Sequence, residues 1–234
     1  MAVPRSLRPL AGYLAGSAAA ALSTAAPPAG GGLAGAGKTD HQAAVLVLLT
    51  GDPDPVVLLT RRAAGLRHHA GQVSFPGGTI ENGEGVVSAA LREAAEEVGL
   101  EPAWASVLGE LPSARIPVSR FAVAAVVAWW DGAGPVRAQN PAEVASVEQV
   151  AVSRLADPAT RLTWVHPSGR TGPGFAFGDV FVWGFTAAVL DVVLKAGGWE
   201  RPWQRARQVP VPELFLPDER SAAVFPTASE AAGG

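Results

Sequence analysis

The clearest hydrophobic pattern in the chain is an unbroken apolar run at residues 43–50, AAVLVLLT. A run without polar alternation is typical of a strand that is buried on both faces. Residues 51–55, GDPDP, have the composition of a turn. The next run, VVLLT at residues 56–60, therefore predicts a second strand paired with the first, and a short extended segment is expected at residues 72–75.

Two segments have the period of a helix instead. Residues 85–98 carry apolar positions at i, i+4, i+7 and i+11, which form one stripe at Val87, Leu91, Ala94 and Val98. Gly99 follows as the expected left-handed cap. Residues 184–196, GFTAAVLDVVLKA, predict a second strong helix that ends at Gly197 and Gly198.

Strands and helices are interleaved irregularly along the rest of the chain. Strands are predicted at residues 104–111, 121–130 and 143–150, a short helix at 152–157, and a hairpin from strands at 161–165 and 175–177. This order predicts an α+β fold, or a mixed sheet between helices.

Composition divides the chain into three parts. Residues 1–40 predict a helix near 7–22 and a flexible Pro/Gly linker at 27–37, with a signal peptide as the alternative interpretation. Residues 41–203 form the predicted domain, and residues 204–234 are a Pro-rich tail that we expect to be loosely packed. No segment is apolar enough to predict a membrane span.

Charge and cysteine content exclude several classes of function. The net charge of −3 gives no basic surface for nucleic-acid binding. The chain has no cysteine, which excludes disulfides, thiolate metal sites and cysteine nucleophiles. This composition favours a cytoplasmic protein.

Three glutamates crowd the end of the helix predicted at residues 85–98. Glu93, Glu96 and Glu97 have i, i+3, i+4 spacing and therefore share a face. The helix dipole disfavours negative charge at this end by about 0.3–1 kcal/mol for each group. A hard divalent cation would reverse that penalty, because carboxylate clusters suit Mg²⁺ or Mn²⁺. The alternative is a solvated acidic face.

The residues around the three glutamates favour a metal site over a solvated acidic face. Gly78-x5-Glu84-x7-Arg92-Glu93-Ala94-x-Glu96-Glu97-x-Gly99-Leu100 resembles the Nudix box at every fixed position. The resemblance implies a Nudix fold, with a mixed β-sheet sandwiched between α-helices, and hydrolysis of a nucleoside diphosphate linked to another group. It also implies the following roles: metal ligands at Glu93, Glu96, Glu97 and the Gly78 backbone, an orienting Arg92, and an accessory carboxylate at Glu84.

The segment before the box narrows the range of expected substrates. Leu58-Leu59-Thr60-x-Arg62-Ala63-x3-Arg67-x3-Gly71-x3-Phe75-Pro76-Gly77-Gly78 is similar to the motif of coenzyme A pyrophosphatases. Arg62 and Arg67 suit the anionic substrate, because guanidinium groups bind phosphate through two hydrogen bonds. The motif adds Gly77 and Gly78 to the substrate site. Phe75 is expected either to pack on the adenine or pantetheine of the substrate, or to be a core residue.

The resemblance implies a metal-dependent pyrophosphatase that cleaves coenzyme A, or its acyl derivatives, to adenosine 3′,5′-bisphosphate and 4′-phosphopantetheine. The alternatives are another nucleoside diphosphate derivative such as NADH or ADP-ribose, or a non-enzymatic nucleotide-binding Nudix module. The expected partner is then a small-molecule substrate. The sequence does not decide whether the protein forms a homodimer. The sequence also does not identify the general base. Glu110, Glu143 and Glu148 are candidates, each with the alternative of an exposed glutamate near a strand end.

Overall fold

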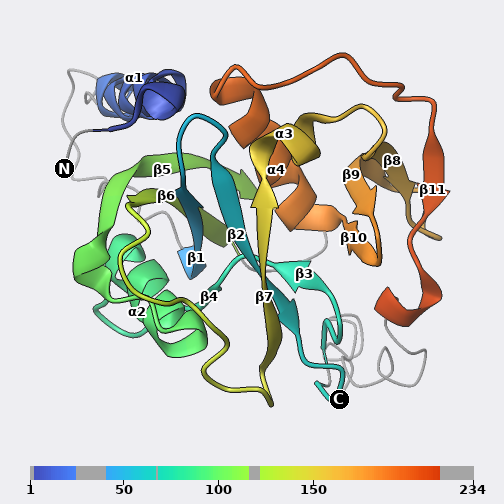
Figure 1. The fold of residues 1–234 in the computed structure, drawn as a ribbon, viewed down its shortest axis with the longest axis horizontal. Helices are drawn as coiled ribbons and strands as arrows, with labels where there is room; N and C mark the ends of the chain where they lie inside the picture. Colours follow the sequence, from blue (N-terminus) through green and yellow to red (C-terminus); the bar gives the residue numbers. More distant parts are fainter. Residues whose placement is uncertain (1–2, 25–40, 67, 116–121, 217–234) are drawn as a thin grey trace, which may run out of the picture.

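The protein forms a large mixed β-sheet between helices and a smaller sheet beside it (Figure 1). The computed structural model describes residues 3–24, 41–66, 68–115 and 122–216. The helices are α1 (Arg8–Thr24), α2 (Val86–Val98), α3 (Val152–Ala156) and α4 (Gly184–Ala196), with short 3-10 turns η1 (Arg5–Leu7), η2 (Pro102–Trp104) and η3 (Glu213–Phe215).

The large sheet is organised around β1 (His41–Thr50). Its strands run in the order β3 (Val73–Ser74), β2 (Val56–Arg62), β1, β6 (Ala122–Trp130) and β5 (Ala105–Arg115). β1 is antiparallel to β2 and parallel to β6, so the sheet is mixed. β4 (Gly77–Thr79) also pairs with β1, and β7 (Val144–Ala151) pairs with β2.

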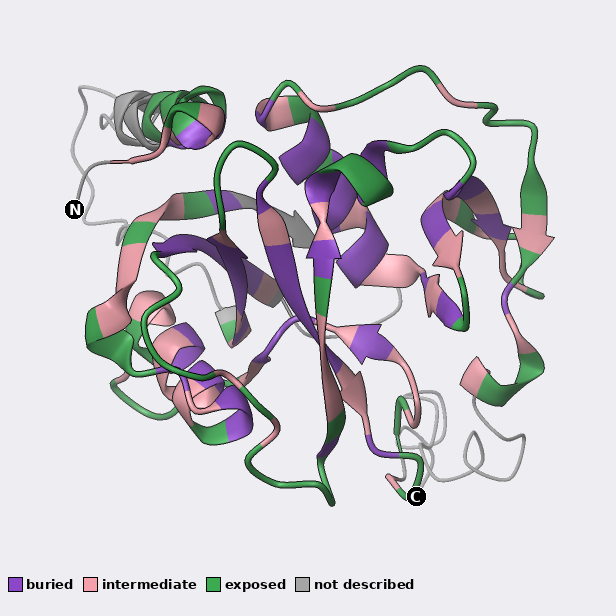
Figure 2. Ribbon diagram, viewed as in Figure 1, coloured by how far each residue is buried: buried purple, intermediate pink, exposed green. Residues whose placement is uncertain are grey.

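The two faces of this sheet carry two separate hydrophobic cores. Val47 and Leu49 of β1 point into a core closed by α1, α3 and α4, whereas Leu46 and Leu48 point into a core closed by α2. Figure 2 shows the buried residues along the central strands and on the parts of α2 and α4 that face them. The apolar run at residues 43–50 is explained by this burial on both faces, and the predicted α+β sandwich is confirmed.

The N-terminal helix belongs to the packed body of the protein. Leu7, Leu10 and Leu14 are fully buried in the core that α4 and the large sheet also form. A side chain at Gly109 of β5 would begin 3.0 Å from the Leu14 side chain, so the helix lies close against that strand. The predicted helix is confirmed. The predicted linker lies outside the described residues.

The smaller sheet runs in the order β10 (Val180–Val182), β9 (Thr171–Phe177), β8 (Arg161–Val165) and β11 (Gln208–Pro210). β8 and β9 form the predicted hairpin, although β9 begins at Thr171, inside the segment expected to be loop. β11 pairs in parallel with β8, and Val211 after it is buried. The prediction of a loosely packed tail is therefore wrong for β11 and Val211, whereas residues 204–207 are exposed.

No helix among the described residues is long and apolar enough to cross a membrane.

Candidate active site

Helix α2 brings its carboxylates onto one face of the large sheet, beside β1 and β4, because small residues let it approach closely. Its buried residues are Ala89, Ala90, Ala94, Glu97 and Val98. Val87 and Leu91, which the predicted stripe included, are only partly buried at the margin of that core. Gly99 has φ of 70° and closes the helix as predicted. The helix is therefore rotated so that Glu97 enters the interface with the sheet.

Gly77 and Gly78 form part of β4, a strand for which no element was predicted. β4 lies so close to β1 that a side chain at Gly77 would begin 2.4 Å from the Ala44 carbonyl oxygen. The Gly77 N–H points the other way and donates to Glu97 Oε2 at 3.2 Å. A side chain at Gly78 would begin 2.5 Å from Glu93 Oε1. The backbone of the two glycines therefore packs directly against the side chains of Glu93 and Glu97.

Glu93 and Glu97 are carboxylates in a poorly solvated position. Glu97 is 8% exposed, and burial raises its pKa to about 7, against the hydrogen bond from Gly77. Burial also raises the pKa of Glu93, although Arg92 opposes this change. Charge repulsion from Glu93 further raises the pKa of Glu97, and repulsion from Glu96 and Glu143 further raises the pKa of Glu93. Ionisation of both carboxylates at once is therefore disfavoured in the absence of a bound cation.

Arg92 connects the helix to the loop that precedes it. Its Nε and Nη2 donate to the two oxygens of Glu84 at 3.0 and 3.1 Å, and this pairing lowers the pKa of Glu84. Nη1 donates to Glu93 Oε1 at 2.9 Å, and Nη2 also donates to the Thr79 carbonyl oxygen at 3.0 Å. Arg92 therefore fixes the position of Glu93, and Glu84 acts through Arg92.

The donor chemistry of this cluster fits a hard divalent cation, although its third carboxylate is turned outward. The Glu96 side chain is 60% exposed and lies 3.5 Å from Arg92 Nη1. Within the described residues, no three His, Asp or Glu side chains form a ready-made metal site. The poorly solvated pair Glu93 and Glu97 still supplies carboxylate oxygens, which are the ligands that Mg²⁺ or Mn²⁺ prefers.

The residues predicted to bind substrate separate into three groups. Arg62 is half-buried, its charge acts on Glu97, and its Nε has no hydrogen-bond partner among the described residues. Arg67 lies outside the described residues. Phe75 is 2% exposed and belongs to the core on the α4 side of the sheet, so a ligand cannot reach it. The core interpretation of Phe75 therefore holds, and we leave it out of the proposed substrate contacts.

A turn distant in sequence closes the end of α2. The N–H groups of Arg137 and Gln139 donate to the carbonyl oxygens of Val98 and Glu97 at 2.9 and 3.0 Å. Glu143 follows on this turn, and its carbonyl oxygen accepts from the Ala63 N–H at 2.9 Å, next to Arg62. This capping by backbone groups was missed, because main-chain donors leave no mark in a sequence.

The three candidate bases differ in their surroundings. The charge of Glu143 contributes to the raised pKa of both Glu93 and Glu97, so its carboxylate lies near the cluster. Glu148 instead forms an ion pair with Arg61 at 3.3 Å and accepts from the Ser146 hydroxyl. Glu110 is exposed on β5. Only Glu143 of these three is brought to the end of α2.

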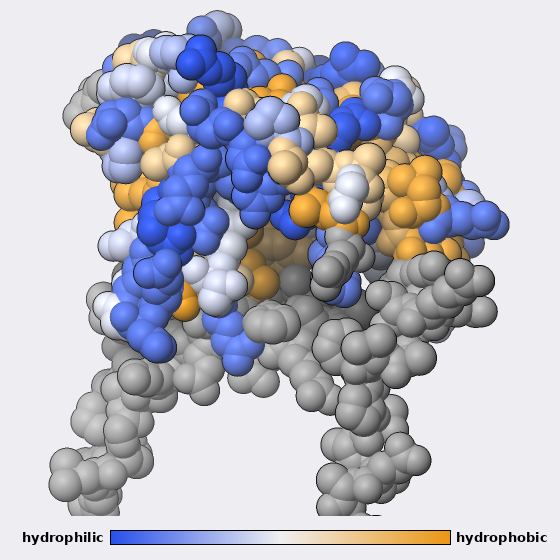
Figure 3. Space-filling view, turned by 90° about the horizontal axis from the view of Figure 1, so that it is seen from below, coloured by the Kyte–Doolittle hydropathy of each residue, from blue (hydrophilic) through white to orange (hydrophobic). Residues whose placement is uncertain are grey.

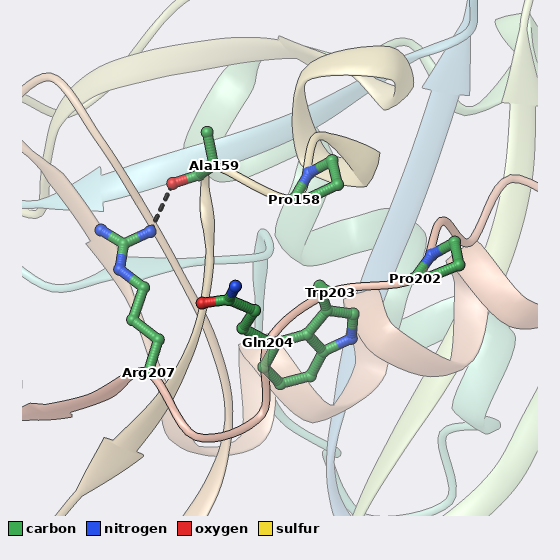
Figure 4. Close-up of a pocket in the computed structure, with 6 residues that line it drawn as sticks. All are labelled: Pro158, Ala159, Pro202, Trp203, Gln204 and Arg207. Atoms are coloured by element: carbon green, nitrogen blue, oxygen red, sulfur yellow. Dashed lines mark hydrogen bonds between the residues drawn. The ribbon is translucent and has the colours of Figure 1, made fainter.

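A cavity lies elsewhere among the described residues. It measures about 620 Å³ and is lined by Pro158, Ala159, Pro202, Trp203, Gln204 and Arg207 (Figure 4). Arg207 Nη1 is already bound to the carbonyl oxygen of Ala159. The carboxylate cluster, by contrast, is a surface formed by helix α2, strand β4 and the turn at Glu143.

We expect Gly78→Ala to lower kcat about tenfold, because the added methyl group would displace the Glu93 carboxylate from its place beside Arg92. Its cost in stability should be small, since the clash is with a movable side chain. Gly77→Ala is the matched comparison. Its methyl group meets backbone atoms of Ala44 and Val45, so we expect a loss of about 1–3 kcal/mol in stability. Assays of kcat and urea unfolding on both variants would check this, and equal effects on stability would contradict it.

Comparison with known proteins agrees with this geometry. The NUDIX domain family matches residues 40–170. The chain is 39% identical over 171 residues to the uncharacterized Nudix hydrolase NudL of Cronobacter sakazakii, covering 69% of this chain and 85% of that protein. It is 37% identical over 166 residues to NudL of Escherichia coli strain SMS-3-5 / SECEC, covering 67% and 83%.

A solved structure shows the same fold. RenU, a Nudix hydrolase from M. smegmatis, superposes with a TM-score of 0.51 at 20% identity, over 71% of this chain and 91% of that one. The family match covers more than half of the chain, and the relatives are similar over most of their own length. The protein therefore belongs to the Nudix hydrolase family.

Proposed function

We propose that this protein is a metal-dependent pyrophosphatase that hydrolyses the diphosphate of coenzyme A, or of its acyl derivatives. The products are adenosine 3′,5′-bisphosphate and 4′-phosphopantetheine, with the acyl group still attached where there is one. A cytoplasmic location is part of the same proposal, since the chain contains no cysteine and coenzyme A is a substrate of the cell interior.

The observation that supports this substrate most is the state of Arg62. Its guanidinium group lies near the carboxylate cluster, and its buried Nε has no hydrogen-bond partner among the residues that the structure describes. A buried donor without a partner is costly, and a phosphate oxygen would satisfy it. The same motif supplies Arg67, so the loop can offer two guanidinium groups to a substrate that carries three phosphates.

The residues that would hold the metal are Glu93, Glu96 and Glu97, together with the Gly78 carbonyl oxygen. When bound, Mg²⁺ or Mn²⁺ would neutralise the diphosphate and assist the attack of water on phosphorus. The chain supplies the rest. Arg92 holds Glu93 in place, Arg62 orients the substrate, and Glu143 accepts the proton of the attacking water at its carboxylate.

Two other functions remain as alternatives. Another nucleoside diphosphate derivative, such as NADH or ADP-ribose, would use the same cluster but would not need the arginines for a 3′-phosphate. A non-enzymatic nucleotide-binding module would need neither Glu93 nor Glu97, and such a module could replace costly buried carboxylates by neutral side chains. Their retention favours an enzyme.

The direct test is incubation of the protein with coenzyme A and either Mg²⁺ or Mn²⁺, followed by identification of the products. We expect release of adenosine 3′,5′-bisphosphate. Failure to release it with either metal would end the proposal. A comparison of kcat/KM for coenzyme A and dephospho-coenzyme A then measures the contribution of the 3′-phosphate to recognition. Equal values would favour a different nucleoside diphosphate derivative as the substrate.

Arg62→Ala is expected to raise KM for coenzyme A about tenfold with a smaller change in kcat, because it removes a charged hydrogen bond to phosphate. The sequence motif extends this expectation to Arg67→Ala. Arg61→Ala is the matched control, since Arg61 is engaged by Glu148 and Asp179. An unchanged KM in Arg62→Ala, or an equal rise in Arg61→Ala, would contradict the phosphate-binding role.

A further inference from the structure

Aromatic side chains gather on the outer face of the smaller sheet, at the margin of a third and small hydrophobic core formed by Leu162, Trp164 and Val211. Val180 and Val182 of β10 point into the main core, so Phe181 between them points outward. Trp183 continues the extended backbone and lies on the same outward side as Phe181. Phe215 of η3 stacks on Phe181 with ring centroids 6.3 Å apart. We call Phe181, Trp183 and Phe215 the aromatic strip.

The strip is only partly covered. All three side chains are half-buried, and the neighbouring Leu214 is 70% exposed. Seen from below (Figure 3), hydrophilic residues gather on the α2 side of the molecule and a patch of apolar residues lies on the side of the smaller sheet and η3. Exposed apolar patches mark contacts with proteins, membranes or ligands, and a position next to a polar site favours a ligand.

Hydrogen bonds join the strip to residues 62–72, which begin with Arg62 at the end of β2 and which we call the arginine loop. The Arg62 N–H donates to the Gln72 carbonyl oxygen at 2.9 Å, so Gln72 lies beside the proposed phosphate contact. The Gln72 side chain in turn donates from Nε2 to the Phe215 carbonyl oxygen at 3.0 Å. A side chain at Gly71 would begin 3.8 Å from the Phe215 ring. One end of the strip therefore lies against the loop that would hold the phosphates.

We propose that the Phe181 and Phe215 end of the aromatic strip binds the adenine ring of the substrate, while the arginine loop holds its phosphates. This inference rests on the proposed function and deepens it. A nucleobase has two apolar faces that stack on aromatic side chains, and each such contact contributes substantially to affinity. Phe75, the aromatic residue that the sequence motif offers for this purpose, is buried.

The position of the strip supports adenine over the other half of the substrate. In coenzyme A the 3′-phosphate and the adenine are attached to one ribose, so a loop that binds that phosphate must leave the base nearby. The opposite half is a flexible amide chain without an aromatic ring. Phe181, Trp183 and Phe215 also lie beyond residues 40–170, so the subsite belongs to a part of this chain that the family match does not include.

The test uses the two reaction products as separate probes on the full chain with Mg²⁺. Binding of adenosine 3′,5′-bisphosphate and of 4′-phosphopantetheine is measured by calorimetry for the wild type, Phe181→Leu and Phe215→Leu. We expect each variant to bind the bisphosphate about tenfold more weakly and phosphopantetheine without change. Phe181→Tyr should restore binding. Phe177→Leu, which removes a ring from the inner side of the same sheet, is the control.

Three outcomes separate the inference from the proposed function. If coenzyme A is cleaved but the leucine variants bind the bisphosphate normally, or lose both products equally, the adenine subsite is wrong. Loss of phosphopantetheine alone would assign the strip to the other half of the substrate and would also overturn it. If the wild type cleaves only ADP-ribose or NADH and the variants raise KM for it, the coenzyme A proposal fails while the adenine subsite stands.

Discussion

Glu97→Gln is expected to lower kcat by about 100-fold or more while making the metal-free protein more stable. Both effects have one cause. Glu97 is a buried carboxylate beside Glu93, and glutamine keeps its shape and its acceptor for the Gly77 N–H but removes its charge. The proposed metal needs that charge, whereas the metal-free fold is destabilised by it.

The stabilisation should depend on pH in a defined direction. The pKa of Glu97 is raised from 4.5 to about 7 on folding. Below pH 4.5 the group is protonated in both the folded and unfolded states and has no effect. As pH rises from 4.5 to 7 the unfolded chain loses the proton first, so the wild type loses stability. Above pH 7 the full penalty applies, about 2–3 kcal/mol.

Urea unfolding in EDTA at pH 5 and pH 8 measures this difference. Glu97→Gln should exceed the wild type by about 2–3 kcal/mol at pH 8 and by much less at pH 5. Saturating Mg²⁺ should stabilise the wild type far more than the variant. Glu96→Gln makes the same charge change at an exposed position and should leave stability nearly unchanged. A variant with normal kcat, or one less stable than wild type at pH 8, would refute the role of Glu97.

The central sheet could be predicted because its burial follows directly from residue type. An apolar run such as residues 43–50 is stable only where both of its faces are buried, and in the structure it lies between two hydrophobic cores. The rotation of α2 about its own axis was harder to predict from the sequence. The hydrophobic period favours large residues such as Val87 and Leu91, but close approach to the sheet buries Ala89 and Ala90 instead. Ala94 and Val98 of the predicted stripe are buried as expected. Pairing of β11 was missed because a strand of three residues depends on its partner, not on its own pattern.

The site was predictable as far as it is local in sequence. The i, i+3, i+4 spacing correctly places Glu93 and Glu97 near each other, because a helix fixes that geometry. It does not distinguish the buried Glu97 from the exposed Glu96, since burial depends on how β4 crosses the helix. The contribution of Glu143 depends on a turn some forty residues later in the chain, and sequence spacing carries no information about such an approach.

The turn that carries Glu143 is fixed on both sides, and this makes its proposed role testable. Backbone hydrogen bonds attach Gln139 to the end of α2 and Glu143 to Ala63, while the Glu143 carboxylate is exposed and contacts only the Asn140 amide, at 3.4 Å, among the described residues. A carboxylate beside the cluster that is not engaged in an ion pair within the described chain is available to accept a proton from water.

Glu143→Gln is therefore expected to lower kcat about 100-fold with little change in KM, since it removes a proton acceptor and keeps the shape of the side chain. Stability should hardly change, because the side chain is exposed. Steady-state kinetics with coenzyme A, or with whichever substrate the screen identifies, would measure this. Glu148→Gln is the matched control and should keep its kcat, since Glu148 is paired with Arg61.

A purely structural role for Glu143 would have a different signature. In Glu143→Ala the shortened side chain leaves room at an exposed turn, so added formate should restore part of the lost kcat if a carboxylate is all that is missing. Formate cannot repair a displaced turn. Full activity in Glu143→Gln, or a loss in Glu143→Ala that formate leaves unchanged while Glu143→Asp is equally inactive, would mean that another group takes the proton.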